Sequence, residues 1–383
     1  MKRKVQGWIS LLCCAVFAMF WGDAKAVEGE KINSSARSAI LIEKETGRVL
    51  LADNPNERLP MASTTKVMTA LLALEYGALD EIVTVSRNAY GVPGTSIYLG
   101  LGEQITLQDL LYGLMLASGN DAAVAIAEHI GGDVESFCRM MTERAAQLGC
   151  TDTIFLTPHG LPKEGHFTTA HDLSLIAREA MSHELFREIV STRRASIPWE
   201  GRSYQRILNN KNRLLSDYEG ATGIKTGYTK AAGRCLVFGA RRNGMEVIGV
   251  VLKCSDWFGE AARIMDEGFA RYEWFEPLKK DEIIRILPVR DGTQETVCVL
   301  AGSNLGAPVL RGRIPVLEYD IPDEIQAGLE LGDVVGEARM ILCGETIAQA
   351  PLVAGEMLAR RDYAYELERV IQNWTVLPAM MVE

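Results

Sequence analysis

The pattern of apolar and polar residues divides the first part of the chain into a helical stretch between two β-rich stretches. Apolar residues recur at helical spacing over most of residues 106–190. β-prone runs lie before it at 38–52 and after it at 202–208 and 223–253, where Asn243-Gly244 indicates a type I′ hairpin. We therefore predict an antiparallel sheet whose first and last strands meet, with the helices inserted between them.

A second β-rich region begins near Glu276. Short β-type runs alternate with turns at residues 283–289, 295–300, 309–317, 334–342 and 346–351. These runs predict a small all-β sandwich over residues 276–355. The region carries no cluster of candidate catalytic residues, so we expect it to act as a spacer or scaffold.

The tail, residues 356–383, has a helical pattern of its own. This amphipathic helix either lies at a membrane surface, with Trp374 as an anchor, or docks on its own domain. The polar face is not strongly basic, but the clear amphipathic pattern favours the membrane surface. The apolar face carries Tyr363, Leu367, Val370, Ile371, Trp374 and Leu377.

The N-terminus has the pattern of an export signal. Lys2, Arg3 and Lys4 precede an apolar stretch over residues 8–21, and Ala24-Lys25-Ala26 forms a cleavage site. We predict a signal peptide over residues 1–26, which places the mature chain outside the cytoplasm. An uncleaved anchor is the alternative, but the apolar stretch is short for a membrane span of about 20 residues.

Charge and cysteine content narrow the class of protein. The formal net charge is −10 in a chain of 383 residues, which argues against a nucleic-acid partner. The six cysteines that follow the signal, Cys138, Cys150, Cys235, Cys254, Cys298 and Cys343, are not spaced as metal ligands. Cys235 and Cys254 flank a predicted hairpin, and we expect them to be free, buried thiols because directly cross-strand disulfides are uncommon.

Candidate chemistry lies in three short patterns. Ser63 and Lys66 are three residues apart at the start of an apolar helical run, so their side chains share one helix face. A lysine whose pKa is lowered by burial or by a nearby cation can act as the base for a serine nucleophile. An N-cap serine beside a solvated lysine would explain this pattern alone. Two later patterns, Ser118-Gly119-Asn120 between helices and Lys225-Thr226-Gly227 on a strand, favour the catalytic interpretation.

The sequence resembles the D-alanyl-D-alanine carboxypeptidases, the low-molecular-mass penicillin-binding proteins of serine peptidase family S11. The resemblance covers nearly the whole mature chain and implies an α/β (α+β), β-lactamase/transpeptidase-like domain over residues 27–275. It also implies a β-rich C-terminal domain and a tail helix that tethers the enzyme to the membrane. The similar stretches are residues 60–69, 116–123, 159–161, 168–173, 223–229, 331–336 and 350–354.

This resemblance implies a serine-type D-Ala-D-Ala carboxypeptidase acting on peptidoglycan pentapeptides. Ser63 would attack the D-Ala-D-Ala bond, Lys66 would take its proton, and Ser118 would relay a proton to the leaving D-alanine. No cofactor or metal is implied, and β-lactams are expected inhibitors. The enzyme is expected at the outer face of the bacterial cytoplasmic membrane. The substrate-binding residues implied are Asn120, Lys225, Thr226 and Gly227, with Lys225 and Thr226 at the terminal carboxylate.

The sequence departs from the family pattern at two places. Tyr228 follows Lys225-Thr226-Gly227, where the family often has a histidine or another polar residue. A basic residue is expected near the start of the helix after the last strand, but Glu260 lies about there and Arg263 is one turn further on. Recognition of the substrate carboxylate beyond Lys225 therefore stays open.

Three other activities compete with this interpretation. A β-lactamase would share the three patterns, but the additional glutamate of an E-x-x-L-N motif is not found before Lys225. A module that only binds cell-wall peptide would not need an activated nucleophile. A D-Ala-D-Ala endopeptidase or transpeptidase would use the same residues and stays open.

Overall fold

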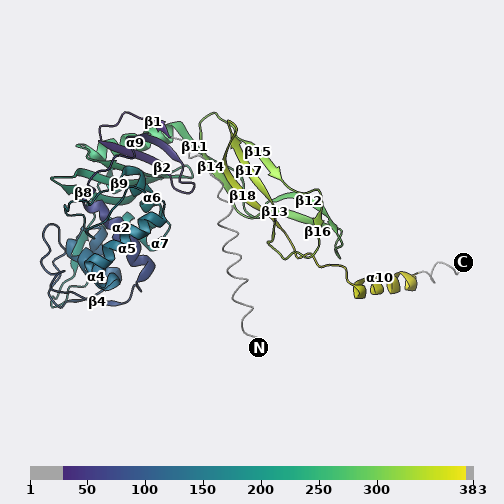
Figure 1. Cartoon of the computed structure of the whole chain (residues 1–383), viewed down its shortest axis with the longest axis horizontal. Helices are drawn as coiled ribbons and strands as arrows, with labels where there is room; N and C mark the ends of the chain where they lie inside the picture. The colour runs from purple at the N-terminus through teal and green to yellow at the C-terminus, as the bar shows by residue number, and fades with distance from the viewer. Residues whose placement is uncertain (1–28, 377–383) are drawn as a thin grey trace. The chain divides into compact units, whose positions relative to one another are not determined.

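The computed structural model describes residues 29–376. The predicted signal peptide and the end of the predicted tail, residues 377–383, lie outside the described residues. The described chain forms two compact units, one ending at Glu273 and the other starting at Trp274 (Figure 1).

The first unit is built on a six-stranded sheet (Figure 1). Its strands are β1 (Glu30–Lys31), β2 (Ser38–Glu43), β3 (Val49–Asp53), β8 (Ala221–Thr229), β9 (Gly233–Arg242) and β10 (Met245–Leu252). The strand order is β1-β3-β2-β10-β9-β8, antiparallel except for the short β1. Val250 of β10 lies opposite Ile40 of β2, so strands from the two ends of this unit are neighbours. The predicted sheet topology is confirmed.

Helices cover both faces of this sheet. Alternate side chains of each strand point to opposite faces, and the central strands β2 and β10 carry apolar side chains on both, which the helices bury. Ile40 and Ile42 of β2 join the core formed with the helical insert. Leu41 faces the other way, where it packs against Gly268 of α9. Figure 1 shows α9 and the helical insert on opposite faces of the sheet. The helices are α2 (Lys66–Tyr76), α3 (Leu107–Met115), α4 (Asn120–Gly131), α5 (Val134–Gln147), α6 (Ala170–Ala180), α7 (Glu184–Ser191), α8 (Leu214–Asp217) and α9 (Trp257–Arg271).

Two small hairpin-like pairs lie outside the main sheet. β4 (Ile82–Thr84) pairs with β5 (Gln104–Thr106), and β6 (Arg194–Ile197) pairs with β7 (Arg206–Asn209). The strand predicted over residues 202–208 is therefore wrong in its first half, because residues 202–205 belong to the bend between β6 and β7.

The second unit is all-β apart from its last helix. The residues between β14 and β15 form a turn in which Gly312 has φ +79°, so the single run predicted over residues 309–317 is in fact two strands. Leu278 and Leu305 from the smaller sheet share one core with Val299 and Leu352 from the larger sheet. The small sheet pairs β11 (Tyr272–Leu278) with β14 (Leu305–Leu310), and the large sheet contains β15 (Val316–Asp320), β17 (Val334–Leu342), β18 (Glu345–Ala354), β13 (Thr296–Ala301), β12 (Ile283–Arg290) and β16 (Ile325–Gln326).

The tail contains helix α10 (Tyr363–Val376). Its first turn is capped by Asp362, whose Oδ1 accepts a hydrogen bond from the Tyr365 N–H at 2.8 Å. Tyr363, Leu367, Val370 and Ile371 are all exposed on this helix. The predicted positions of Trp374 and Leu377 on the apolar face lie outside the described side chains. No helix within residues 29–376 has the length and apolar character needed to cross a bilayer.

The six cysteines of residues 29–376 are free. Cys235 and Cys254 are buried, so the expectation for them is confirmed. Cys138 and Cys150 are also buried, Cys298 is half-buried, and Cys343 is exposed in the turn between β17 and β18.

Candidate active site

Three elements bring the predicted site residues into one region. Ser63 lies in the 3₁₀ turn η1 (Ala62–Thr65), which leads directly into α2. Ser118 precedes α4 and has φ +62°. Non-glycine residues rarely adopt this conformation, and those that do are frequently found at functional sites. Lys225 lies on β8, the last strand in the sheet order.

Lys66 is fully buried at the start of α2, directly beside Ser63. Its Nζ donates to Ser63 Oγ at 3.0 Å, to Asn120 Oδ1 at 2.8 Å and to the His159 carbonyl oxygen at 2.7 Å. All three acceptors are uncharged. Burial lowers the Lys66 pKa well below its usual value, and the positive charges of Lys225 and Lys211 lower it further. A lowered pKa increases the fraction of molecules in which the amine is neutral and has a free lone pair for a proton.

The loop formed by residues 93–99 holds the second pattern, Ser118-Gly119-Asn120, in place. The Asn120 side chain donates from Nδ2 to the Pro93 carbonyl at 2.7 Å, which orients its Oδ1 toward Lys66. Thr95 Oγ1 donates to the Ser118 carbonyl at 2.5 Å. Asp121 accepts hydrogen bonds from the N–H groups of Ile97 and Leu99, each at 3.1 Å. These contacts hold Asn120, Asp121 and the Ser118 carbonyl against residues 93–99.

The third pattern faces the first along β8. Lys225 is buried, donates to the Thr226 carbonyl at 3.0 Å, and has its pKa lowered to about 7 by burial and then by Lys211. A Cβ at Gly227 would lie 2.9 Å from the Ser63 nitrogen and 3.0 Å from the Thr64 nitrogen. Only glycine allows β8 to approach the nucleophile turn this closely.

Comparison with known proteins assigns the chain to a family. The family model for D-alanyl-D-alanine carboxypeptidase matches residues 24–256, and the model for the penicillin-binding protein 5 C-terminal domain matches residues 272–360. The chain belongs to the D-alanyl-D-alanine carboxypeptidase family. It is a serine-type D-Ala-D-Ala carboxypeptidase of the low-molecular-mass penicillin-binding proteins, as the resemblance implied.

Relatives share both the sequence and the fold. D-alanyl-D-alanine carboxypeptidase DacF of Bacillus subtilis is 33% identical over 380 residues, covering 96% of each chain. DacC of Escherichia coli is 34% identical over 340 residues, covering 84% of each chain. The solved structure of penicillin-binding protein 5 from Haemophilus influenzae is 30% identical with a TM-score of 0.71, covering 86% of this chain and 99% of that one. The Streptomyces K15 DD-transpeptidase is 35% identical with a TM-score of 0.60, covering 63% of this chain and 99% of that one.

The carboxypeptidase site includes groups that the sequence patterns do not single out. The His159 carbonyl is one of the three acceptors around Lys66 Nζ. A Cβ at Gly160 would lie 1.8 Å from the Ala62 carbonyl oxygen, so this loop lies directly against η1. Similarity to the family marks residues 159–161 but gives no reason for their role, because the contact spans about 90 residues of sequence.

His166 stabilises the turn η1 through a chain of hydrogen bonds. Its Nδ1 accepts from the Leu156 N–H at 3.0 Å, which leaves the proton of the neutral ring on Nε2, 3.0 Å from Thr65 Oγ1. Thr65 in turn donates to the Ala62 carbonyl at 2.9 Å. Burial lowers the His166 pKa to about 4, so this neutral tautomer persists at neutral pH. No sequence pattern indicated this chain of hydrogen bonds.

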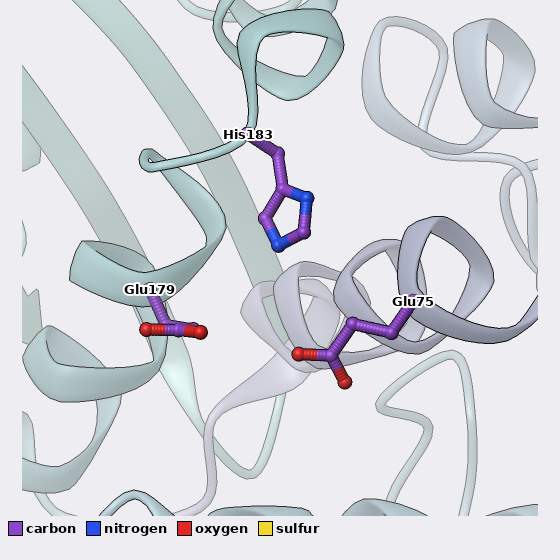
Figure 2. Close-up of side chains that lie close together, drawn as sticks. All are labelled: Glu75, Glu179 and His183. Atoms are coloured by element: carbon purple, nitrogen blue, oxygen red, sulfur yellow. The ribbon is translucent and has the colours of Figure 1, made fainter. Parts of the chain in front are cut away.

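One cluster away from the catalytic residues has the composition of a metal site. Figure 2 shows Glu75 of α2 and Glu179 of α6 with His183 close by, and their ligand atoms lie within 4.8 Å of one another. Arg144 of α5 already occupies this cluster, because its Nη2 lies 2.7 Å from Glu75 Oε1 and 2.9 Å from Glu179 Oε1. The arrangement is that of an ion-pair network joining three helices.

Proposed function

We propose that Ser63 is the nucleophile and Lys66 the general base in the removal of the terminal D-alanine from peptidoglycan pentapeptides. The observation that supports this most strongly is the 3.0 Å hydrogen bond between a fully buried Lys66 Nζ and Ser63 Oγ. Burial and nearby cations lower the Lys66 pKa, which favours the neutral amine. Its lone pair can then accept the serine proton as the serine oxygen attacks.

Acylation transfers one proton in a circuit. Ser63 Oγ bonds to the carbonyl carbon of the D-Ala-D-Ala bond while its proton passes to Lys66 Nζ. The carbonyl electrons move to oxygen, which the Ser63 N–H stabilises as part of an oxyanion hole. When the carbon–nitrogen bond breaks, Lys66 returns the proton through the Ser118 hydroxyl to the departing amine of D-alanine. Water then attacks the acyl carbon while Lys66 takes one of its protons. The bond from Ser63 Oγ to that carbon breaks, the proton passes from Lys66 to Ser63 Oγ, and the shortened peptide is released.

Substrate binding is proposed for the other pattern residues. Lys225 and Thr226 bind the terminal carboxylate by charge-assisted hydrogen bonds. Asn120 holds Lys66 and the substrate amide. Gly227 contributes indirectly in this proposal. Because it has no Cβ, the Ser63 N–H stays free to bind the oxyanion.

We also propose a function for each region of the chain. Residues 27–275 form the catalytic domain, and residues 276–355 hold it as a spacer. Family members act on peptidoglycan outside the cytoplasm, which is consistent with residues 1–26 acting as a cleavable signal peptide. β-Lactams, inhibitors typical of this family, are expected to acylate Ser63 by the same attack.

D-Alanine release from a pentapeptide tests the catalytic proposal. The mature chain is expected to release one D-alanine per peptide, and Ser63→Ala is expected to release none. Ser216→Ala, which changes an exposed serine of the same domain, serves as the matched control. Release by Ser63→Ala at the wild-type rate would contradict the assignment.

We also propose that α10 holds the enzyme at the membrane surface. The support is its row of exposed apolar side chains, which includes Leu367 and Ile371. The mature chain is expected to float with phospholipid vesicles, and Leu367→Asp with Ile371→Asp is expected to stay unbound. Glu368→Gln, on the polar side, is the control. Equal flotation of all three chains would contradict this role of the apolar face.

A further inference from the structure

A groove of about 720 Å³ lies beyond the Gly227 end of β8. Its walls come from the ends of β8 and β9 next to the turn that joins them, from the segment between β10 and α9, and from the first residue of α9. Two of its lining residues are cations and none of the seven is an acid, which favours an anionic ligand. The lining residues are Tyr228, Gly233, Arg234, Lys253, Cys254, Ser255 and Trp257.

Strand register places Arg234 on the same sheet face as Thr226. The missing Cβ of Gly227 points at η1, so Thr226 and Tyr228, one residue away on either side, point to the opposite face. Arg234 of β9 lies directly across from Tyr228, and cross-strand partners share a face. Arg234 and Thr226 are therefore diagonal neighbours, a spacing that a long side chain can bridge.

The Arg234 side chain can donate hydrogen bonds to an anion in this groove. It is exposed, and its guanidinium lies 5.9 Å from the centre of the Trp257 ring. It donates from Nη1 to the Ser255 carbonyl at 2.6 Å, which uses one of the five N–H donors of a guanidinium. Arg263 on α9, by contrast, is committed to Glu260 at 2.7 Å and Glu267 at 2.8 Å.

We propose that Arg234 binds the terminal carboxylate of the peptide substrate together with Thr226, and thereby selects peptides with a free C-terminus. A guanidinium fits a carboxylate through two parallel hydrogen bonds, which a lysine cannot match. The carboxylate is the group that distinguishes a peptide ending in D-Ala-D-Ala from the same peptide with a blocked C-terminus. This inference rests on the proposed carboxypeptidase function and names the residue that restricts it to chain ends.

The test compares two substrates that differ only at the carboxylate. Wild type, Arg234→Ala and Arg234→Lys are assayed as full mature chains on a peptide ending in D-Ala-D-Ala and on its C-terminal carboxamide. Arg234→Ala is expected to lower kcat/KM for the free acid by about 10–100-fold, the value of a charge-assisted hydrogen bond, and to leave the carboxamide within about twofold. Arg234→Lys is expected to restore part of the loss, because it keeps the charge without the planar fork.

A matched control exists within the same domain. Arg202 is also exposed and also lies 5.9 Å from a tryptophan ring, that of Trp199. Arg202→Ala is expected to leave both substrates unchanged. The rate of acylation by a penicillin and by its methyl ester provides the same comparison without turnover.

Two outcomes would contradict different claims. Equal effects of Arg234→Ala on the acid and the carboxamide, or no effect on either, would overturn the assignment of Arg234. Absence of D-alanine release from the free acid by wild type would overturn the proposed function instead.

Discussion

The two ends of α2 lie beside basic side chains in opposite surroundings. At its first residue, Lys66 donates to three uncharged oxygens, and its pKa is lowered by burial and neighbouring cations. Near its last residue, Glu75 joins Glu179 in binding Arg144, and hydrogen bonds to Glu75 raise the pKa of that guanidinium. One cation without a carboxylate becomes a base, and the other becomes a structural link. Lys66 is fully buried without a bound carboxylate, whereas Arg144 is partly exposed and bound by two, so burial and charge compensation together separate the two roles.

Removing the amine at Lys66 is expected to have the largest effect. Lys66→Ala should lower kcat for D-alanine release by about 10²–10⁴-fold, the usual contribution of a general base. Lys66→Arg should fail as well, because a guanidinium stays protonated and cannot accept the serine proton. Lys230→Ala, an exposed lysine near the end of β8, is the control. Activity of Lys66→Arg close to wild type would show that positive charge, not basicity, is what the site needs.

Gly227→Ala is expected to disturb the nucleophile turn without changing any charge. The added methyl group would press on the backbone nitrogens of Ser63 and Thr64, which cannot move aside as a side chain can. Loss of the oxyanion contact should lower kcat on the order of 100-fold. Gly100→Ala, whose Cβ would meet only the Glu103 side chain at 3.6 Å, should keep wild-type kinetics. Similar kinetics for both variants would rule out close approach as the reason for Gly227.

Asn120→Asp tests the comparison directly, because it gives Lys66 the carboxylate that Arg144 already has. A negative charge at 2.8 Å favours the protonated amine, so the pKa of Lys66 should rise. The rate requires the neutral amine and therefore increases with pH through that pKa, so the acid limb of kcat should move to higher pH. At pH 7 we expect a loss of about tenfold or more, since such pairs shift a pKa by about one to three units. Asn120→Ala removes the same hydrogen bond without adding charge and should leave the acid limb in place.

The alkaline limb of kcat/KM has a separate origin. Lys225 binds the carboxylate only when protonated, and its pKa in the free enzyme is about 7. Binding should therefore weaken as pH rises through that value, which lowers kcat/KM above neutrality. The bound carboxylate favours the charged amine, so kcat should fall only at higher pH. Coinciding alkaline limbs for kcat and kcat/KM would contradict this assignment.

Breaking the network at the far end of α2 is expected to have the smallest effect. Arg144→Met leaves two carboxylates facing each other, but all three side chains are partly exposed, so we expect a loss of about 1 kcal/mol in the free energy of unfolding. Urea denaturation measures this loss, and kcat should stay unchanged. Arg139→Met, which breaks the more exposed pair with Glu135, should cost less. A loss of activity in Arg144→Met at unchanged stability would show that the two ends of α2 are coupled.

Local pattern predicted most of the elements, but not the bounds of the strands at residues 202–208 and 309–317. The periodicity indicated the insert of helices, and the serine, asparagine and lysine patterns lie together as their order suggested. What the sequence did not show are contacts over long separations, such as the His159 carbonyl on Lys66 and the link from His166 to Thr65. The reason is physical, since a backbone carbonyl has no residue signature. The split of residues 309–317 into two strands depends in the same way on one glycine turn.

The intact mass of the mature chain after exposure to penicillin tests the pairing of Ser63 with Lys66 most directly. We predict one covalent adduct on the wild-type chain, located at Ser63 by peptide mapping. Ser63→Ala should carry no adduct, and Lys66→Ala should acquire it far more slowly although its serine is intact. An adduct that forms on Lys66→Ala as fast as on wild type would show that the lysine does not activate the serine and would contradict the account.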